Sequence, residues 1–228
     1  GASVSDVIEI IVYDVFSVGN FYSRTDSDSR FVRHDSGTLG TDNFIAGNNA
    51  GDSITSGGNY NTVVGNEAGT AITTGDRNTA VGFEALKTAT TAQYNVAVGY
   101  QALENNTGNN NTAVGDQALE ANTSGTNNTA VGDDAAVANT TGIRNVAIGN
   151  NALATNQEGD QTVAVGFNAL QAQNPSGNAD MNNTAVGNDA GYATTTGTQN
   201  TYVGASAGAA IVDANNNVAV GYLALSSD

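Results

Sequence analysis

One glycine recurs through most of the chain at a nearly fixed interval, and this repeat constrains the fold more than any other feature. It follows a short apolar triplet, as in segment 78–82 (NTAVG), and successive spacings are 18, 17, 17, 16, 17, 17, 17, 21, 17 and 17 residues. A constant interval of this length indicates a solenoid, in which each repeat contacts only its neighbours. The eleven anchor glycines are Gly47, Gly65, Gly82, Gly99, Gly115, Gly132, Gly149, Gly166, Gly187, Gly204 and Gly221.

Other positions of the unit are as regular as the glycine. Asn lies four residues before ten of the eleven anchors, with Thr162 at the remaining one, and Val or Ile immediately precedes every anchor except at Ala46. A second Gly follows most anchors by about ten residues. Ala lies three residues after every anchor, at Ala50, Ala68, Ala85, Ala102, Ala118, Ala135, Ala152, Ala169, Ala190, Ala207 and Ala224.

These residue types predict an all-β fold. Two glycines in each unit separate two short runs by two turns, because Gly adopts positive φ without strain. The run before the anchor alternates Thr or Val, Ala, and Val or Ile, which is typical of a strand with two unlike faces. Strands this short are stable only when coils stack about 4.8 Å apart and share one core. We therefore predict a β-solenoid, a parallel β-roll of eleven coils, over residues 43–228.

The two faces of the strand suggest different roles. We expect the Val and Ile row before the anchors to fill the core. The Ala rows would let another surface approach closely, either the opposite wall of a thin roll or a neighbouring subunit. Segments such as 84–87 would also suit a helix, so a repeat of one strand plus one helical turn is the structural alternative. Two turn signals in each unit leave little room for that helix.

Residues 1–42 lie outside the repeat and divide into two parts. Residues 1–22 are predicted to form a β-strand segment, which either caps the solenoid or is donated to a neighbouring subunit. Residues 23–42 are polar and are interpreted as a connector; His34 lies there and is assigned no role. The apolar residues of the predicted subunit-linking strand are Val7, Ile8, Ile10, Ile11, Val12, Val15 and Phe16.

One coil is longer than the others. The spacing of 21 residues between Gly166 and Gly187 inserts a loop that contains Asn174, Pro175 and Met181. Insertions in solenoids form surface loops, often on a binding face, so these residues are a candidate interaction loop. A tolerated bulge without a role is the alternative.

Composition excludes several classes of protein. The chain has no Cys, so it has no disulfide framework and no thiolate metal site or nucleophile. Its net charge of −16, with only six Lys and Arg, argues against binding nucleic acid. No apolar run approaches the ~18 residues that a membrane span requires, so no membrane insertion is expected.

No catalytic arrangement emerges either. A Ser-His-Asp triad would require His34, which lies in the connector. The carboxylate pairs Asp133–Asp134 and Glu158–Asp160 occupy variable places in the unit, as solvated turn residues do. We predict a protein that is not an enzyme and has no cofactor. Weak Ca²⁺ binding by Asp and Asn oxygens at the turns stays open.

The repeat also resembles known fibres. The unit N-T-A-V-G-x-x-A-L is similar to the head repeats of trimeric autotransporter (YadA-type) adhesins, and its longer form with N-T-T-G is similar to repeats of phage tail fibres. The resemblance covers residues 43–225. It implies a left-handed β-roll, three chains packed side by side, and a structural or adhesive role without catalysis. The unit length departs from the autotransporter pattern, which leaves the path of each coil open.

Both ends of the chain resemble tail-fibre segments. Residues 4–22 are similar to a segment between an upstream β domain and a stalk, and residues 224–228 to the junction before a self-cleaving intramolecular chaperone. The resemblance implies a processing boundary at Ser227–Asp228. A start at Gly1 without Met suggests a fragment or a processed product.

Together these observations predict an extracellular homotrimeric segment of a phage tail fibre, acting as rigid spacer and host-attachment element on a surface receptor or glycan. The alternative is a bacterial surface adhesin or filament subunit polymerised through its N-terminal strand. A third hypothesis is an ice-binding solenoid. It rests on a Thr ladder eight residues after the anchors, at Thr73, Thr90, Thr107, Thr123, Thr140 and Thr195. The sequence does not identify a receptor. Receptor specificity could also reside in a distal domain of a longer fibre protein.

Overall fold

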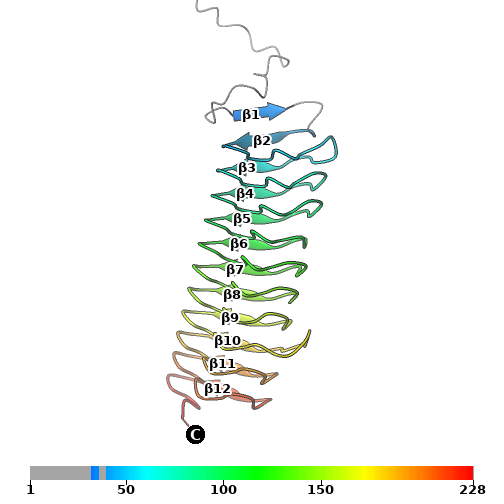
Figure 1. The fold of residues 1–228 in the computed structure, drawn as a ribbon. Coiled ribbons are helices and arrows are strands. Elements are labelled where there is room, and N and C mark those ends of the chain that lie inside the picture. Colours follow the sequence, from blue (N-terminus) through cyan, green and yellow to red (C-terminus); the bar gives the residue numbers. More distant parts are fainter. Residues whose placement is uncertain (1–31, 36–39, 228) are drawn as a thin grey trace, which may run out of the picture.

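The computed structural model describes residues 32–35 and 40–227, and these form a long stack of ring-like coils (Figure 1). All the strands in the described residues belong to one sheet and follow one another in sequence order. They are β1 (Val32–Asp35), β2 (Asn43–Ala46), β3 (Thr62–Val64), β4 (Thr79–Val81), β5 (Val96–Val98), β6 (Thr112–Val114), β7 (Thr129–Val131), β8 (Val146–Ile148), β9 (Val163–Val165), β10 (Thr184–Val186), β11 (Thr201–Val203) and β12 (Val218–Val220).

Strands β2 to β12 are parallel and pair each residue with its equivalent in the next repeat. Ala80 of β4, for example, lies opposite Ala97 of β5. The predicted all-β fold, a parallel β-solenoid, is confirmed. The described ranges contain no helix, so the alternative repeat with a helical turn does not apply.

The N-terminal end of the stack is covered by β1. This strand lies within the segment interpreted as a connector, and it pairs antiparallel with β2. An antiparallel strand satisfies one edge of the sheet without adding a further coil. The strand predicted over Val7 to Phe16 lies outside the described residues, so its role as cap or donated strand stays a prediction.

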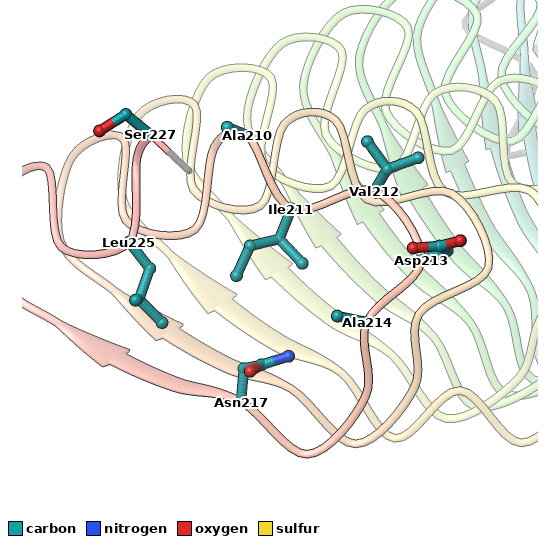
Figure 2. A pocket seen from close by; sticks show the side chains of 8 residues that line it. All are labelled: Ala210, Ile211, Val212, Asp213, Ala214, Asn217, Leu225 and Ser227. Carbon is teal, nitrogen blue, oxygen red and sulfur yellow. The ribbon is translucent and has the colours of Figure 1, made fainter.

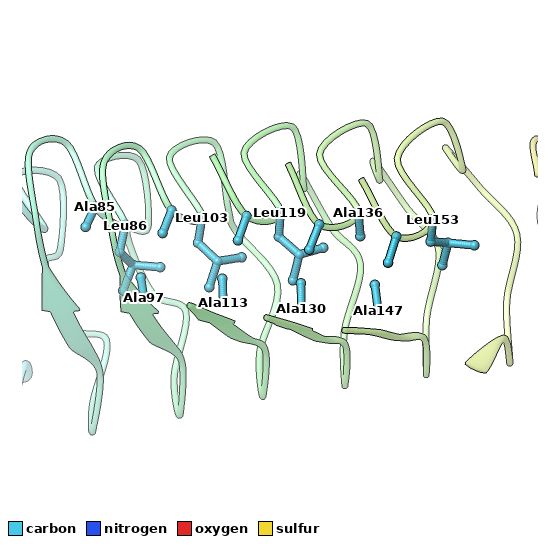
Figure 3. Close-up of a cluster of buried hydrophobic side chains, with 14 of the residues drawn as sticks. Ala85, Leu86, Ala97, Leu103, Ala113, Leu119, Ala130, Ala136, Ala147 and Leu153 are labelled. Atoms are coloured by element: carbon cyan, nitrogen blue, oxygen red, sulfur yellow. The ribbon is translucent and has the colours of Figure 1, made fainter. Parts of the chain in front are cut away.

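The interior is lined by small residues from the strand and larger ones from the opposite wall. In β3 to β11 the middle residue of each strand is buried and the two flanking residues point outward. The Ala row three residues after the anchors is also buried, except for half-buried Ala224. Leu86, Leu103 and Leu119 point from the opposite wall toward the strand alanines (Figure 3).

The expectation that Val and Ile before the anchors fill the core is wrong. This row lies on the outer surface; Val114 is 36% exposed and Ile148 38%. Side chains alternate between the faces of a strand, so Ala and the adjacent Val cannot both face inward. The Leu row four residues after the anchors already fills the interior, which leaves room for only a methyl group on the strand.

Residue volumes inside the coil compensate one another. Where the strand position holds Ala, Leu usually lies four residues after the anchor; where it holds Ile45, Val63 or Tyr202, that position is Gly. A Cβ on Gly208 would lie 2.4 Å from the Tyr202 ring. The pattern keeps the interior close-packed, as protein cores require.

Each coil turns at left-handed backbone positions, many of which are not glycine. In one coil Arg77, Glu84 and Leu86 have φ of 56°, 56° and 53°. Such residues cost about 1–3 kcal/mol each and persist only where the surrounding structure holds them. Here each donates its backbone N–H to the previous or next coil, at 2.9–3.0 Å. The anchor is more restrictive: Gly82 has φ of 141°, and a Cβ there would lie 2.1 Å from the carbonyl oxygen of Gly99.

A buried Asn ladder connects the coils. The Nδ2 of Asn78 donates to the carbonyl of Ala92 at 2.8 Å, and its Oδ1 accepts the backbone N–H of Asn95 at 3.0 Å. Equivalent bonds recur along the solenoid. At the exception, Thr162, the buried Gln173 takes over: its Nε2 donates to Thr162 Oγ1 and its Oε1 accepts from Asn183 Nδ2, both at 2.9 Å.

The volume compensation can be tested at Tyr202. Tyr202→Ala should lower the free energy of unfolding by about 3–5 kcal/mol, as for other large buried aromatic residues. Gly208→Leu alone should also destabilise, because leucine would meet the ring. The double variant recreates the arrangement of Ala97 and Leu103. Its free energy of unfolding should fall by less than the sum of the decreases in the two single variants. Guanidinium unfolding followed by circular dichroism measures this; a fully additive double variant would contradict the prediction.

Candidate interaction surface

The outer side of the sheet forms a face four residues wide that runs along the whole solenoid. Counting from each anchor, positions −5, −3, −1 and +1 are largely exposed or half-buried, whereas Asn at −4 and the strand residue at −2 are mostly buried. We call this surface the outer face, its columns −3 and −1 the middle columns, and its columns −5 and +1 the rims. The middle columns hold Thr or Val at −3 and Val or Ile at −1, except at Phe44 and Ala46.

Charge is distributed unevenly around the solenoid. The middle columns contain no ionisable residue between β2 and β12, although the chain carries a net charge of −16. Carboxylates lie instead on the turns and the opposite wall, such as Glu84 and Asp134 at position +2 and Glu104 and Glu120 at +5. The rims carry three further carboxylates, Asp42, Asp116 and Asp133, so the neutral, β-branched strip is confined to the middle columns.

Two aromatic columns stand on the rims of the outer face. On the −5 rim the Arg77 guanidinium lies between the rings of Tyr60 and Tyr94, 5.4 Å from each ring centre, and donates to the Tyr94 hydroxyl at 3.0 Å. On the +1 rim Phe83 stacks on Tyr100, with ring centres 5.4 Å apart and planes 10° apart. Ring stacking and cation–π contacts hold these side chains in place, although the rings are 39–52% exposed.

The opposite wall carries a network of charged side chains. Lys87 contacts Glu84 and also Glu67, the latter at 3.2 Å. Hydrogen bonds from Lys87 and then Gln101 lower the pKa of Glu84, and the bond to Glu84 raises the pKa of Lys87. Glu104 has no such donor: desolvation, and then the negative charge of Glu84, raise the pKa of Glu104.

The carboxylate pairs considered from the sequence do not converge on one site. Desolvation and then Asp133 raise the pKa of Asp134, while desolvation raises the pKa of Asp160 although it accepts the N–H of Ile143 at 2.7 Å. Within residues 32–35 and 40–227, no three His, Cys, Asp or Glu side chains come together as metal ligands would. No helix in the same part of the chain could cross a membrane. Weak Ca²⁺ binding stays a prediction.

The inserted loop projects beyond the neighbouring coils near β10 (Figure 1). Of the three residues predicted there for interaction, Asn174 is exposed but Pro175 and Met181 are buried. The loop folds back over earlier coils, since Thr141 donates to the Asn178 side chain at 3.0 Å. A partner would therefore meet polar side chains, and Pro175 and Met181 anchor the loop.

The Thr ladder serves the stack itself. Hydroxyls of this column donate to the backbone carbonyl of the next coil, as Thr73 does to Thr90 and Thr123 does to Thr140, both at 3.0 Å. Thr107, Thr140 and Thr195 do the same at 2.7–3.2 Å. Because their hydrogens point into the stack, they do not form a free lattice of donors, and the ice-binding hypothesis loses the feature on which it rested.

The C-terminal end of the described stack is open. No strand of the described chain pairs beyond β12, and Val218 and Val220 are 70% and 68% exposed. A hollow of 340 Å³ lies there, between Ile211, Leu225 and their neighbours (Figure 2). Ser227 lines this hollow. Asp228 lies outside the described residues, so the predicted processing boundary stays a prediction.

Comparisons with known protein families, curated proteins and solved structures each found no match. The resemblance to phage tail fibres and trimeric autotransporters therefore stays a prediction from the repeat. The outer face was not foreseen from the sequence, because the Val and Ile residues that form it were placed in the core. Its signal was present in the alternation between outward Val81 and inward Ala80.

The raised pKa of Glu104 gives a test of the acidic wall. A carboxyl whose folded pKa lies above its unfolded value binds its proton more tightly when folded, so stability falls as pH rises through the folded pKa. Glu104→Gln should therefore stabilise the protein at pH 7 and have little effect near pH 4. Thermal unfolding at both pH values measures this, with Asp213→Asn on an exposed turn as control. An equal gain at both pH values would refute the electrostatic cause.

Proposed function

We propose that this chain is a non-enzymatic fibre protein whose copies associate side by side through the outer face. In this proposal it forms a homotrimeric segment of an extracellular fibre, such as a phage tail fibre, that acts as rigid spacer and attachment element. The observation that carries the proposal is the continuous neutral strip of Val, Ile and Thr on an otherwise acidic solenoid. Large exposed apolar patches of this kind are typical of interaction sites.

The dimensions of the outer face suit a stable interface. Strands about 4.8 Å apart and residues about 3.3 Å apart give a face roughly 50 Å long and 20 Å wide, or about 1,000 Å² on each copy. Stable interfaces bury about 800 Å² on each partner. The middle columns alone supply about half of the face, so the rims contribute to a sufficient area.

Electrostatics favours the same face. Two chains that each carry a net charge of −16 repel one another when the acidic walls of their solenoids approach. Contact through the middle columns brings no carboxylate pairs together there and leaves the acidic walls in water. Three copies around one axis is the number that the resemblance implies. The alternative is end-to-end polymerisation of an adhesin or filament subunit through residues 4–18.

The attachment role would involve a host receptor or glycan. The solenoid offers the polar inserted loop near β10 and the acidic turns for such contacts. The outer face would be covered by other copies and would not be available. A rigid, regular rod suits a spacer because parallel ladders connect each coil to the next along the stack.

Charge placed on the outer face should separate the copies. Native wild-type protein is expected to have a discrete mass of three times 22.9 kDa by light scattering. Val131→Asp with Val165→Asp should give single chains at the same concentration and leave the β-sheet circular dichroism unchanged. Burying several aspartates together without partners costs several kcal/mol, which accounts for the separation.

The matched control places the same two charges elsewhere. Ser124→Asp with Thr196→Asp modifies exposed turn residues and should keep the wild-type mass. A monomeric wild-type protein would overturn the proposed association. An open distribution of masses that the Val131 and Val165 substitutions leave unchanged would favour the polymer instead.

A further inference from the structure

The middle columns of the outer face do not specify the register in which two copies would associate. Thr or Val at −3 and Val or Ile at −1 recur in almost every coil, so a neighbouring copy would fit nearly as well after sliding by one coil. A repetitive face specifies its register weakly, as flat and uniform strands do. Sliding matters because a staggered contact repeats into an open filament, whereas contact at equal height closes into a ring.

The rims hold the features that differ between coils. The aromatic residues stand together on only three successive coils, those of Gly65, Gly82 and Gly99, at Tyr60, Arg77 and Tyr94 on one rim and Phe83 and Tyr100 on the other. Most other coils carry polar side chains at these positions, and Phe167 and Tyr222 are single aromatic residues on the +1 rim of distant coils. The aromatic residues thus mark one height along a solenoid that is otherwise nearly uniform.

We propose that the two aromatic columns pack against each other between neighbouring copies and fix the register of the association. This inference rests on the proposed function, because it needs copies that associate through the outer face. Rotation about an axis parallel to the solenoid brings the −5 rim of one copy beside the +1 rim of the next, whether the ring has two or three members. At equal height, Arg77 then faces the neighbouring copy's Phe83, and Tyr94 faces its Tyr100.

Chemistry and preorganisation support this pairing. Arg, Tyr and Phe are enriched at the centres of protein interfaces, where they form the contacts that matter most for affinity. Here they are already ordered within each copy: Arg77 is held between two rings and Phe83 against Tyr100. Association would therefore lose little side-chain freedom at these residues.

Other registers are less favourable. A stagger of two coils leaves at most one contact between the columns and places Tyr94 against Asp133 or Asn66. A stagger of one coil in one direction keeps as many contacts between the columns, because Tyr60 then faces Phe83 and Arg77 faces Tyr100. However, this stagger accumulates around the ring, so the last copy no longer meets the first and the assembly stays open.

The repeat itself supplies the substitutions for a test. Asn occupies position −5 at Asn110 and Asn127 and position +1 at Asn150 and Asn188. The variant Arg77→Asn, Tyr94→Asn, Phe83→Asn and Tyr100→Asn therefore introduces only residues that other coils already accept. Phe167→Asn with Tyr192→Asn is the control, since it removes two exposed aromatic residues away from the three coils that carry the aromatic columns; Phe167 stands on the +1 rim without an aromatic neighbour on the adjoining coils.

The register between copies is measured with a spin label attached to the Ser124→Cys variant. This variant has a single thiol because the chain has no other Cys. Wild-type and control proteins should show one narrow label-to-label distance and a discrete mass. The fourfold variant should stay associated but show several distances and a spread of masses. An unchanged narrow distance in the fourfold variant would overturn the register role while leaving the proposed association intact. A monomeric wild-type protein would overturn both.

Discussion

The solenoid depends on a buried Asn side chain that recurs in almost every coil and makes hydrogen bonds to the next coil. Asn at position −4 accepts the backbone N–H of the next coil and donates to the carbonyl of the second turn, so a single residue connects the strand to the turn that closes the coil. A buried amide costs free energy when it is unpaired. When all its hydrogen bonds are made, it favours the one register of the coils in which those bonds form. Where Thr162 breaks the pattern, Gln173 bridges the gap with different bonds, from its Nε2 to Thr162 Oγ1 and from Asn183 Nδ2 to its Oε1.

Local constraints made the fold predictable. The anchor glycine combines a φ that side chains avoid with a close approach to the next coil, so its recurrence reports the coil directly. The inside and outside of the strand were not predictable in the same way. Val81 is larger and more apolar than Ala80, yet Ala80 faces the core. What excludes Val81 is Leu86 on the opposite wall, reached through left-handed residues that the sequence does not mark.

This arrangement puts the larger apolar side chains of the strand outside and small or amide side chains inside. The strand side of the core, where Ala predominates, buries little apolar area for each residue, and the parallel ladders add hydrogen bonds between successive coils. The Val and Ile rows are then apolar surface that the single chain leaves uncovered. Association through that face would add the hydrophobic stabilisation that the thin interior lacks, which links assembly to folding in one structural feature.

Variation along the repeat shows where specific recognition between copies can arise. Positions −4 and −2 are constrained by the ladder and by packing volume, and positions −3 and −1 barely vary. Of the positions on the outer face, the rims vary most, and their residues lie outside the three-residue strands of β3 to β12. If uniform faces provide attraction between copies, the discrimination between alternative registers has to come from the rims, where Arg77, Phe83 and Tyr100 are the most distinctive residues.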